Sequence, residues 1–252
     1  MSLFKRNSAD QAEKWNIRTM YGPNLNFAAT EAYKLLRTNI MFSFANEGMG
    51  HVVGVTSSVQ SEGKSSTASN TAYALAESGA KVLLLECDLR RPSIASKLGL
   101  VRMPGLSNLL ISKGDYRDMI QHCPVAPGVD ILVSGDIPPN PSELLSSNRM
   151  EQLVTQLRKD YDYIVVDLPP VTVVSDALAI SKLLDGVVMV VRAGVSDRQM
   201  LAEAMRQLSM VDVRILGFVY REVDDGKKKY GYKYNKKYYR YYQEYAKKPG
   251  KK

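Results

Sequence analysis

The sequence predicts an α/β fold in which a doubly wound, mostly parallel sheet carries helices on both faces. Five apolar runs recur along the chain, and they are mostly continuous in Val, Ile and Leu instead of alternating with polar residues. Such runs are typical of strands that are buried on both faces of a parallel sheet. Helical patterns separate the runs, and this alternation indicates the fold class. With 252 residues, 45% of them hydrophobic, the chain can bury a sizeable core.

The elements are expected in the following order. Residues 1–27 read as an irregular polar lead-in, and Thr30 is expected to cap a helix that reaches about Phe44. An amphipathic helix is predicted around Met150, Leu153, Val154 and Leu157, which are spaced i, i+3, i+4, i+7. Ser196 is expected to cap a last helix over 198–208. The predicted strands are 51–56, 81–86, 163–167, 186–191 and 213–220.

Positive charge gathers at the C-terminal end. The chain carries 34 Lys and Arg against 26 Asp and Glu, a net charge of +8, and such a charge first suggests nucleic acid or an anionic membrane. Residues 227–252 alone hold ten Lys and one Arg against the single acid Glu244, so they are +10 and the rest of the chain is −2. Because this segment has almost no aliphatic residues, we expect a flexible C-terminal tail.

Two absences from the sequence bear on location. Cys87 and Cys123 are too few for a disulfide framework or a four-cysteine metal site, which favours a reduced, cytoplasmic setting. The apolar runs are far shorter than the roughly 20 residues of a membrane-spanning helix, and no export signal is visible at the N-terminus. Membrane contact is therefore expected only through a partner or through surface charge.

A loop after the first predicted strand has the ending of a phosphate-binding loop, Gly63-Lys64-Ser65, although Ser58 stands where the full pattern has glycine. Small residues let backbone N–H groups turn toward a phosphate at a helix N-terminus. Lys64 can reach the β- and γ-phosphates, and the Ser65 hydroxyl can bind Mg²⁺. The alternative is a chance match in a Ser/Gly-rich loop. The candidate nucleotide-binding residues are Ser58, Ser61, Glu62, Gly63, Lys64, Ser65 and Ser66.

Acidic residues stand at the ends of two predicted strands. Glu86 and Asp88 follow one apolar run, and Asp167 ends another. Ligands of open α/β sheets bind beyond the carboxyl ends of the strands, and carboxylate oxygens suit Mg²⁺. One such acid alone is more often a helix cap or a surface acid, but three beside the loop favour a site. We predict Ser65, Asp88 and Asp167 as metal ligands, whereas Asp176 is expected to cap a helix.

Together these motifs resemble the bacterial tyrosine kinases of capsule and exopolysaccharide synthesis. That family combines a P-loop, an Asp-x-Asp-x-Arg motif, an Asp-x-Pro-Pro motif and a C-terminal tyrosine cluster. The resemblance covers nearly the whole chain from about residue 28. Its counterparts here are Gly63-Lys64-Ser65, Glu86-x-Asp88-x-Arg90, Asp167-x-Pro169-Pro170, the segment 135–145, and Glu31, Lys34 and Arg37, which are similar to a Glu-x-x-Arg-x-x-Arg subunit-contact motif.

The resemblance implies an autokinase that uses ATP and Mg²⁺. It implies an irregular segment over 1–27, a P-loop kinase domain over 28–225 and a basic tyrosine-rich tail over 226–252. The implied catalytic residues are Lys64, Glu86, Asp88, Arg90 and Asp167, with Asp88 or Glu86 orienting or deprotonating the tyrosine hydroxyl. The bases of the tail are expected to favour its approach to a carboxylate-lined cleft or to phosphorylated neighbours. The implied phosphoacceptors are Tyr230, Tyr232, Tyr234, Tyr238, Tyr239, Tyr241, Tyr242 and Tyr245.

The resemblance also implies partners. The tail of one subunit would enter the site of the next in a homo-oligomeric ring, with Glu31, Lys34 and Arg37 at the interface. A membrane adaptor would activate the kinase at the inner face of the plasma membrane, and a cognate tyrosine phosphatase would reverse the modification. The kinase would regulate polysaccharide polymerisation and export, and no nucleic-acid partner is expected.

Three departures from the family pattern stand out. Gln60-Ser61 replaces Pro-Gly in the loop. Lys34 replaces an arginine, and lysine cannot make the bidentate pair that an arginine makes. Glu86 replaces the first aspartate of the second motif and adds one methylene, which would shift a metal-bound water or the tyrosine hydroxyl.

Other functions remain open at this point. The chain could be a non-kinase ATPase switch like the septum-positioning and chromosome-partition ATPases, but these usually carry a lysine where this chain has Val59. It could also be a catalytically weak scaffold whose tail binds polyanions. The tail itself could dock as an aromatic helix face or bind single-stranded nucleic acid by charge and stacking.

Overall fold

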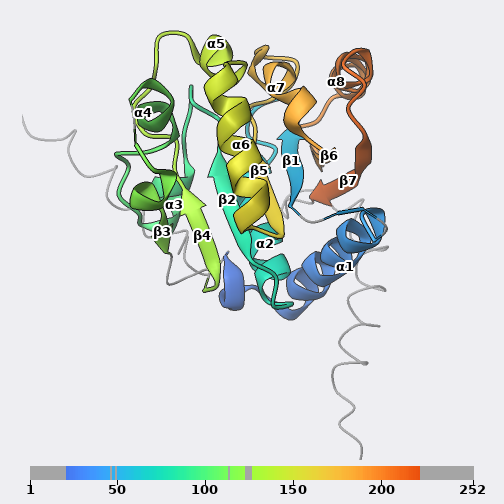
Figure 1. Ribbon diagram of the computed structural model, residues 1–252. Helices are drawn as coiled ribbons and strands as arrows, with labels where there is room; N and C mark the ends of the chain where they lie inside the picture. The colour runs from blue at the N-terminus through green and yellow to red at the C-terminus, as the bar shows by residue number, and fades with distance from the viewer. Residues whose placement is uncertain (1–20, 46, 49, 113, 123–126, 222–252) are drawn as a thin grey trace, which may run out of the picture.

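A single seven-stranded sheet forms the centre of the molecule in the computed structural model (Figure 1). The structure describes residues 21–221 apart from 46, 49, 113 and 123–126. The strand order is β3-β4-β2-β5-β1-β6-β7, and all neighbours are parallel except the β3–β4 pair. The strands are β1 (His51–Ser57), β2 (Val82–Glu86), β3 (Gln121–His122), β4 (Val129–Leu132), β5 (Tyr163–Asp167), β6 (Gly186–Arg192) and β7 (Ile215–Arg221).

The predicted fold class is confirmed, and the five predicted strands are present to within two residues at each end. β3 and β4, at one edge of the sheet, were not predicted. β3 has two residues and β4 has four with Asp130 among them, so neither forms a long apolar run. Pairing of β4 with β2, and of β3 with β4, defines this edge of the sheet, and no apolar pattern in the sequence indicates it.

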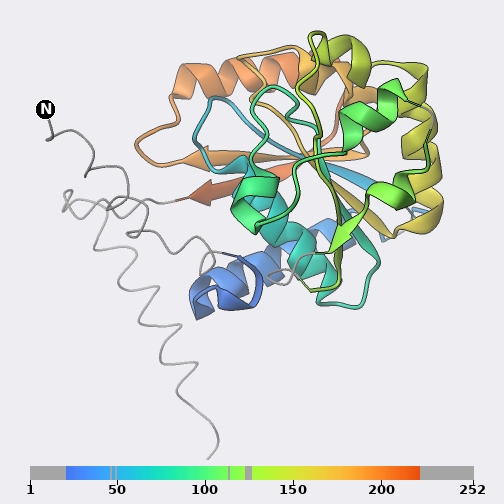
Figure 2. The same ribbon diagram turned by 90° about the vertical axis from the view of Figure 1, so that its left-hand side faces the viewer.

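Helices cover both faces of the sheet, as Figures 1 and 2 show. The short 3-10 turn η2 (Gly22–Asn24) lies with α1 (Phe27–Ser43), α2 (Lys64–Ala76) and α3 (Ile94–Leu98) over one hydrophobic core. The other core lies under α4 (Leu106–Ile111), α5 (Pro141–Leu145), α6 (Asn148–Asp160), α7 (Asp176–Ala179) and α8 (Arg198–Met210). The 3-10 turns η3 (Tyr116–Met119) and η4 (Ser181–Leu183) complete the described elements.

The amphipathic stripe of α6 is confirmed, because Met150, Leu153, Val154 and Leu157 are all buried. Two predicted helix caps are wrong. Asn26, not Thr30, caps α1, since its side chain accepts from the N–H of Ala29 at 2.9 Å. Asp197, not Ser196, caps α8 by accepting from the N–H of Gln199 at 2.7 Å. The observed cap of α1 lies about one turn before the predicted one, and the observed cap of α8 lies one residue after it.

The end of the lead-in belongs to the core. Tyr21 is buried, its hydroxyl lies 2.9 Å from the Ser66 hydroxyl on α2, and Gly22 donates to Asn70 at 3.0 Å. The expected irregular segment over 1–27 is therefore too long at its C-terminal side, because η2 and the start of α1 lie within it. Residues 1–20 and the tyrosine tail lie outside the described residues. Within the described part of the chain, no helix combines the length and apolar character that crossing a bilayer requires.

Candidate active site

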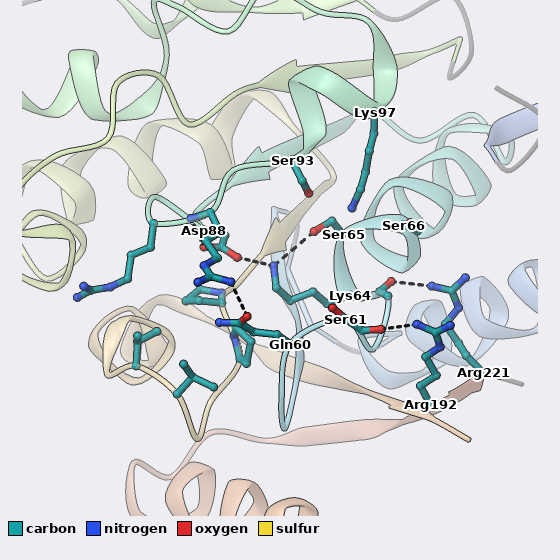
Figure 3. Close-up of a pocket in the computed structure, with 17 residues that line it drawn as sticks. Gln60, Ser61, Lys64, Ser65, Ser66, Asp88, Ser93, Lys97, Arg192 and Arg221 are labelled. Atoms are coloured by element: carbon teal, nitrogen blue, oxygen red, sulfur yellow. Dashed lines mark hydrogen bonds and ion pairs between the residues drawn. The ribbon is translucent and has the colours of Figure 1, made fainter. Parts of the chain in front are cut away.

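A cleft of about 910 Å³ opens beyond the carboxyl ends of the central strands. Parallel pairing aligns these ends, because Asp167 on β5 stands opposite Val55 on β1 and Glu86 on β2. Figure 3 shows the side chains that point into the cleft from the loop after β1, from α3 and from the ends of β6 and β7. Its lining includes Gln60, Ser61, Gly63, Lys64, Ser65, Ser66, Asp88, Arg90, Arg91, Lys97, Arg192 and Arg221.

The loop between β1 and α2 is the P-loop expected from the sequence. Gly63 has φ +94° and Ser61 has φ +64°, so both lie in the left-handed region that favours glycine. The family pattern has glycine at the place of Ser61. The positive φ of Ser61 shows that the backbone keeps a glycine-like conformation there although the residue is a serine. The carbonyls of Ser61 and Gly63 accept from Arg192 at 2.7 Å and from Arg221 at 3.1 Å. Two arginines thus hold the loop from β6 and β7.

Two predicted nucleotide-binding residues lie behind the loop instead of on the cleft. The buried Glu62 carboxylate accepts from the Ser58 hydroxyl at 3.0 Å and from the N–H of Val59 at 2.8 Å, and Ser196 donates to it from the α8 side. Ser58 and Glu62 therefore brace the loop from within, and neither lines the cleft. Ser61, Gly63, Lys64, Ser65 and Ser66 do line it, as expected.

Lys64 joins the two acidic strand ends. Its Nζ lies 2.7 Å from Asp88 Oδ2 and 3.4 Å from Asp167 Oδ1. Burial lowers the pKa of Lys64, but the carboxylates of Asp167 and Asp88 more than offset this and hold the pKa above its usual value. Lys64 is therefore a charged group at neutral pH, held between two acids until an anionic ligand competes for it.

Two of the three residues predicted to hold Mg²⁺, Ser65 and Asp167, have the oxygen ligands and the position that suit that ion, whereas the third, Asp88, is paired with Lys64. Asp167 is fully buried, its side chain hydrogen-bonds with Ser65, and its Oδ2 has no hydrogen-bond partner among the described residues. Burial raises the pKa of Asp167, and the neighbouring Lys64 opposes that rise. The described residues contain no cluster of three His, Cys, Asp or Glu suited to a metal. Mg²⁺ takes one or two carboxylates and completes its shell with phosphate and water.

The structure contradicts the assignment of Glu86 as a residue that meets the substrate. Glu86 is fully buried and does not line the cleft. Its Oε1 accepts from the N–H groups of Ser93 and Ile94 at 2.6 and 2.7 Å, and its Oε2 accepts from Ser134 at 3.1 Å. Burial raises its pKa, and these backbone bonds oppose the rise. The additional methylene lets the carboxylate reach the start of α3, leaving Asp88 as the candidate for the tyrosine hydroxyl.

Arg90 is held by Asp176. Its Nε and Nη2 donate to the two carboxylate oxygens at 2.8 and 3.1 Å, and the Ser142 hydroxyl donates to the same carboxylate. Asp176 begins α7, whose N-cap is Ser175, so the expectation that Asp176 caps this helix is wrong. The buried Asp176 carboxylate thus joins three segments: Arg90 of the second motif, the chain after β5, and Ser142 of the segment 135–145.

The cleft is basic, which contradicts the expectation of a carboxylate-lined cleft. Its described lining has one acid, Asp88, and six bases: Lys64, Arg90, Arg91, Lys97, Arg192 and Arg221. Of these six bases, only Lys64 and Arg90 were predicted as site residues from the sequence. Arg192 and Arg221 each follow a predicted strand directly, so the strand-end rule that found the acids could have found them too. Lys97 carried no such signal.

The three predicted interface residues all lie on α1. Glu31 and Lys34 form an ion pair with 2.9 Å between Oε1 and Nζ, and both are partly exposed. Arg37 instead turns toward the neighbouring α2, where it donates to the carbonyl of Ala74 at 3.1 Å. Glu31 and Lys34 thus remain accessible to another subunit, while Arg37 also joins α1 to α2.

The fold and the loop define a P-loop NTPase, and the family comparison agrees. The model described as ParA, NUBPL iron-transfer P-loop NTPase, matches residues 48–223. The chain is 36% identical to the tyrosine-protein kinase YwqD of Bacillus subtilis over 208 residues, 81% of this chain and 85% of that protein. It is 33% identical over 205 residues to the putative tyrosine-protein kinase CapB of Staphylococcus aureus, which covers 81% and 89% of the two chains.

Solved structures agree with these relatives. The crystal structure of the chimerical protein CapA2B2 has a TM-score of 0.75 and 31% identity, and the match covers 82% of this chain and 90% of that one. The chain therefore belongs to the bacterial tyrosine-protein kinase family.

Proposed function

We propose that this protein transfers phosphate from ATP to the tyrosines of its own C-terminal cluster. The observation that carries the proposal is the position of Lys64, which lies at the P-loop between Asp88 and Asp167. An ATP phosphate would compete with these acids for the lysine. Once Lys64 moves to phosphate, the Asp88 carboxylate is free to accept the proton of an incoming tyrosine hydroxyl.

Mg²⁺ would be held by the Ser65 hydroxyl and by Asp167, whose Oδ2 is without a partner among the described residues. When bound, the ion supplies charge neutralisation for the phosphates. The residues of the chain do the remaining work. Lys64 neutralises the transferred phosphoryl group, the P-loop backbone holds the phosphates, and Asp88 orients the acceptor.

The basic cleft suggests an order of binding. The tail is +10 by sequence, and the described cleft lining has six bases against one acid. Like charges oppose the approach of the tail until the nucleotide brings its negative charge. We therefore propose that ATP binds before the acceptor segment.

We also propose that the acceptor tail comes from a neighbouring subunit, with Glu31, Lys34 and Arg37 at the contact. By the family resemblance, a membrane adaptor would hold the kinase at the inner face of the plasma membrane, and a tyrosine phosphatase would reverse the modification. The output would be control of capsule or exopolysaccharide polymerisation and export.

The test is incubation of the purified protein with Mg-ATP, followed by mapping of phosphotyrosine. Phosphate on tail tyrosines that disappears in Lys64→Met supports a kinase. ATP hydrolysis without phosphotyrosine would instead indicate an ATPase switch, and the absence of both, with an adaptor fragment present, would indicate a scaffold. For action in trans, Lys64→Met chains are mixed with active chains whose eight tail tyrosines are phenylalanine. Phosphate on the Lys64→Met chains supports transfer between subunits.

A further inference from the structure

Lys97 is a cleft residue that belongs to none of the motifs recognised in the sequence. It lies on α3, one turn after Ile94, and lines the same cleft as the P-loop. Figure 3 shows its side chain extending from α3 into the cleft toward Ser65 and Ser66 at the start of α2. It therefore approaches the phosphate-binding region from α3, whereas Lys64 extends from α2.

Lys97 differs from the other bases of the cleft in having no partner among the described residues. Lys64 pairs with Asp88, and Arg90 pairs with Asp176. Arg91, Arg192 and Arg221 donate to Gln60, to the Ser61 carbonyl and to the Gly63 carbonyl. No hydrogen bond or ion pair joins the Lys97 ammonium to any residue that the structure describes.

The surroundings of Lys97 favour an anionic ligand. Burial lowers its pKa, Asp167 raises it, and the nearby Lys64 lowers it again. A partly buried ammonium without a partner is costly, because it has lost water without gaining a hydrogen-bond acceptor. A phosphate oxygen in the cleft would supply that acceptor.

The helix that carries Lys97 is held in place. The buried Glu86 carboxylate accepts from Ser93 and Ile94 at the start of α3 and from Ser134 on the next segment. These bonds join α3 to the end of β2, directly beside Asp88. The start of the lysine's own helix is thus fixed to the sheet, so Lys97 projects from a prearranged position.

We propose that Lys97 is a second phosphate-binding lysine, which contacts the phosphate chain of the bound nucleotide from the α3 side of the cleft. The proposal rests on the nucleotide binding of the proposed function and deepens it. It assigns a ligand contact to a residue outside the P-loop, and it adds a role for Glu86 in positioning that residue through α3.

The test is equilibrium binding of N-methylanthraniloyl-ADP with Mg²⁺ to the 252-residue chain, monitored by the fluorescence of the labelled nucleotide. Lys97→Met is expected to raise Kd by roughly tenfold to hundredfold, the size of a lost hydrogen bond to a charged group. Lys97→Arg keeps the charge and is expected to stay within about threefold of the original. Lys182→Met, which removes an exposed lysine paired with Glu151 on α6, is the matched control and should leave Kd unchanged.

Competition with two unlabelled probes separates phosphate contact from general damage to the cleft. Inorganic tripolyphosphate should compete less well in Lys97→Met than in the original protein, while adenosine should compete equally well in both. The salt dependence of Kd should also become shallower in Lys97→Met, because one ionic contact is lost. Lys97→Gln is the second variant if Lys97→Met unfolds.

An unchanged Kd in both Lys97→Met and Lys97→Gln overturns the proposal, and so does an equal loss of adenosine and tripolyphosphate competition. The proposed function fails separately. Suppose that the original protein binds the nucleotide and that Lys97→Met raises Kd, but that no phosphotyrosine forms. The Lys97 contact is then supported and the proposed kinase activity is not. If phosphotyrosine forms and Kd is unchanged in the Lys97 variants, the kinase activity is supported and the Lys97 contact is not.

Discussion

Arg90 and Asp176 form a two-point ion pair that joins the loop after β2 to the start of α7, with nitrogen–oxygen distances of 2.8 and 3.1 Å. Asp176 is fully buried, while the side chain of Arg90 is 43% exposed. The pair is therefore asymmetric, because losing the arginine leaves a buried charge and losing the acid leaves a cation that water can reach.

This asymmetry predicts unequal costs for the two single substitutions. Arg90→Met is expected to lower the free energy of unfolding by about 3 kcal/mol, since Ser142 is then the one described side chain that still donates to the buried Asp176 carboxylate. Asp176→Asn is expected to cost about 1 kcal/mol, as for an ordinary hydrogen bond. Urea denaturation measures both. Arg206→Met, at an exposed pair on α8, is the control, and equal costs for the first two variants would contradict the asymmetry.

Restoring the family's aspartate at position 86 is expected to harm this protein. The shorter side chain of Glu86→Asp cannot keep all three backbone bonds to Ser93, Ile94 and Ser134. The expected loss is about 2 kcal/mol in the free energy of unfolding, as for buried donors left without an acceptor. Hydrogen exchange of these three amides should become faster. Glu203→Asp on the surface of α8 serves as control, and an unchanged stability in Glu86→Asp would argue against a structural carboxylate.

Asp167 is expected to lower the stability of the fold at neutral pH and to be needed for Mg²⁺-dependent nucleotide binding. Burial raises the pKa of Asp167 in the folded protein. Its contribution to stability is therefore fully present below the ordinary carboxyl pKa and is lost as pH rises through the raised value. Asp167→Asn should remove this slope and, without nucleotide, stabilise the fold at pH 7 by about 1 kcal/mol, or roughly 2–4 °C in Tm. Its Mg²⁺-dependent nucleotide binding should be lost.

Thermal melts from pH 4 to pH 8 provide the measurement for Asp167→Asn. Asp118→Asn, at an exposed acid, is the matched control and should keep the slope of the original protein. A variant that is less stable than the original protein at pH 7 would show that Asp167 Oδ2, which has no hydrogen-bond partner among the described residues, does not destabilise the fold.

Gly63 is predicted to tolerate no side chain. Its φ is +94°, and a Cβ built there would lie 1.6 Å from Arg221 Nη1. Gly63→Ala should raise the Kd for Mg-ADP by more than about tenfold and cost roughly 1–2 kcal/mol of stability. Adding Arg221→Ala removes the contact but not the backbone strain, so the double variant should recover only part of the affinity.

Gly79→Ala is the matched control for Gly63→Ala. Gly79 has a similar φ of +91°, but a Cβ there would meet no atom within 4 Å. The control should therefore lose stability through backbone strain and keep its affinity for Mg-ADP. If Gly79→Ala weakens binding as much as Gly63→Ala does, strain in general, and not the P-loop, would explain the effect.

Much of the site could be predicted from local patterns. Lys64, Ser65 and Asp88, which line the cleft, and Asp167, which pairs with Lys64, could be singled out because a P-loop is a contiguous motif and because buried parallel strands show as apolar runs with polar residues at their ends. The roles of Ser58, Glu62 and Glu86 could not be found this way. Each is decided by partners that lie across the loop or on other elements, and a one-letter pattern does not show which way a carboxylate points.

The sequence by itself determined the fold class, the P-loop and the two acidic strand ends, because all of these follow from residues adjacent in the chain. Only the tertiary structure decided that the cleft is basic. Lys97, Arg192 and Arg221 come from three separate elements and line one cleft with the P-loop. The parallel alignment of β6 and β7 brings Arg192 and Arg221 there, whereas Lys97 reaches the cleft from α3. Charge counted along a chain cannot show this, since the field in a cleft depends on which side chains converge there and not on their order.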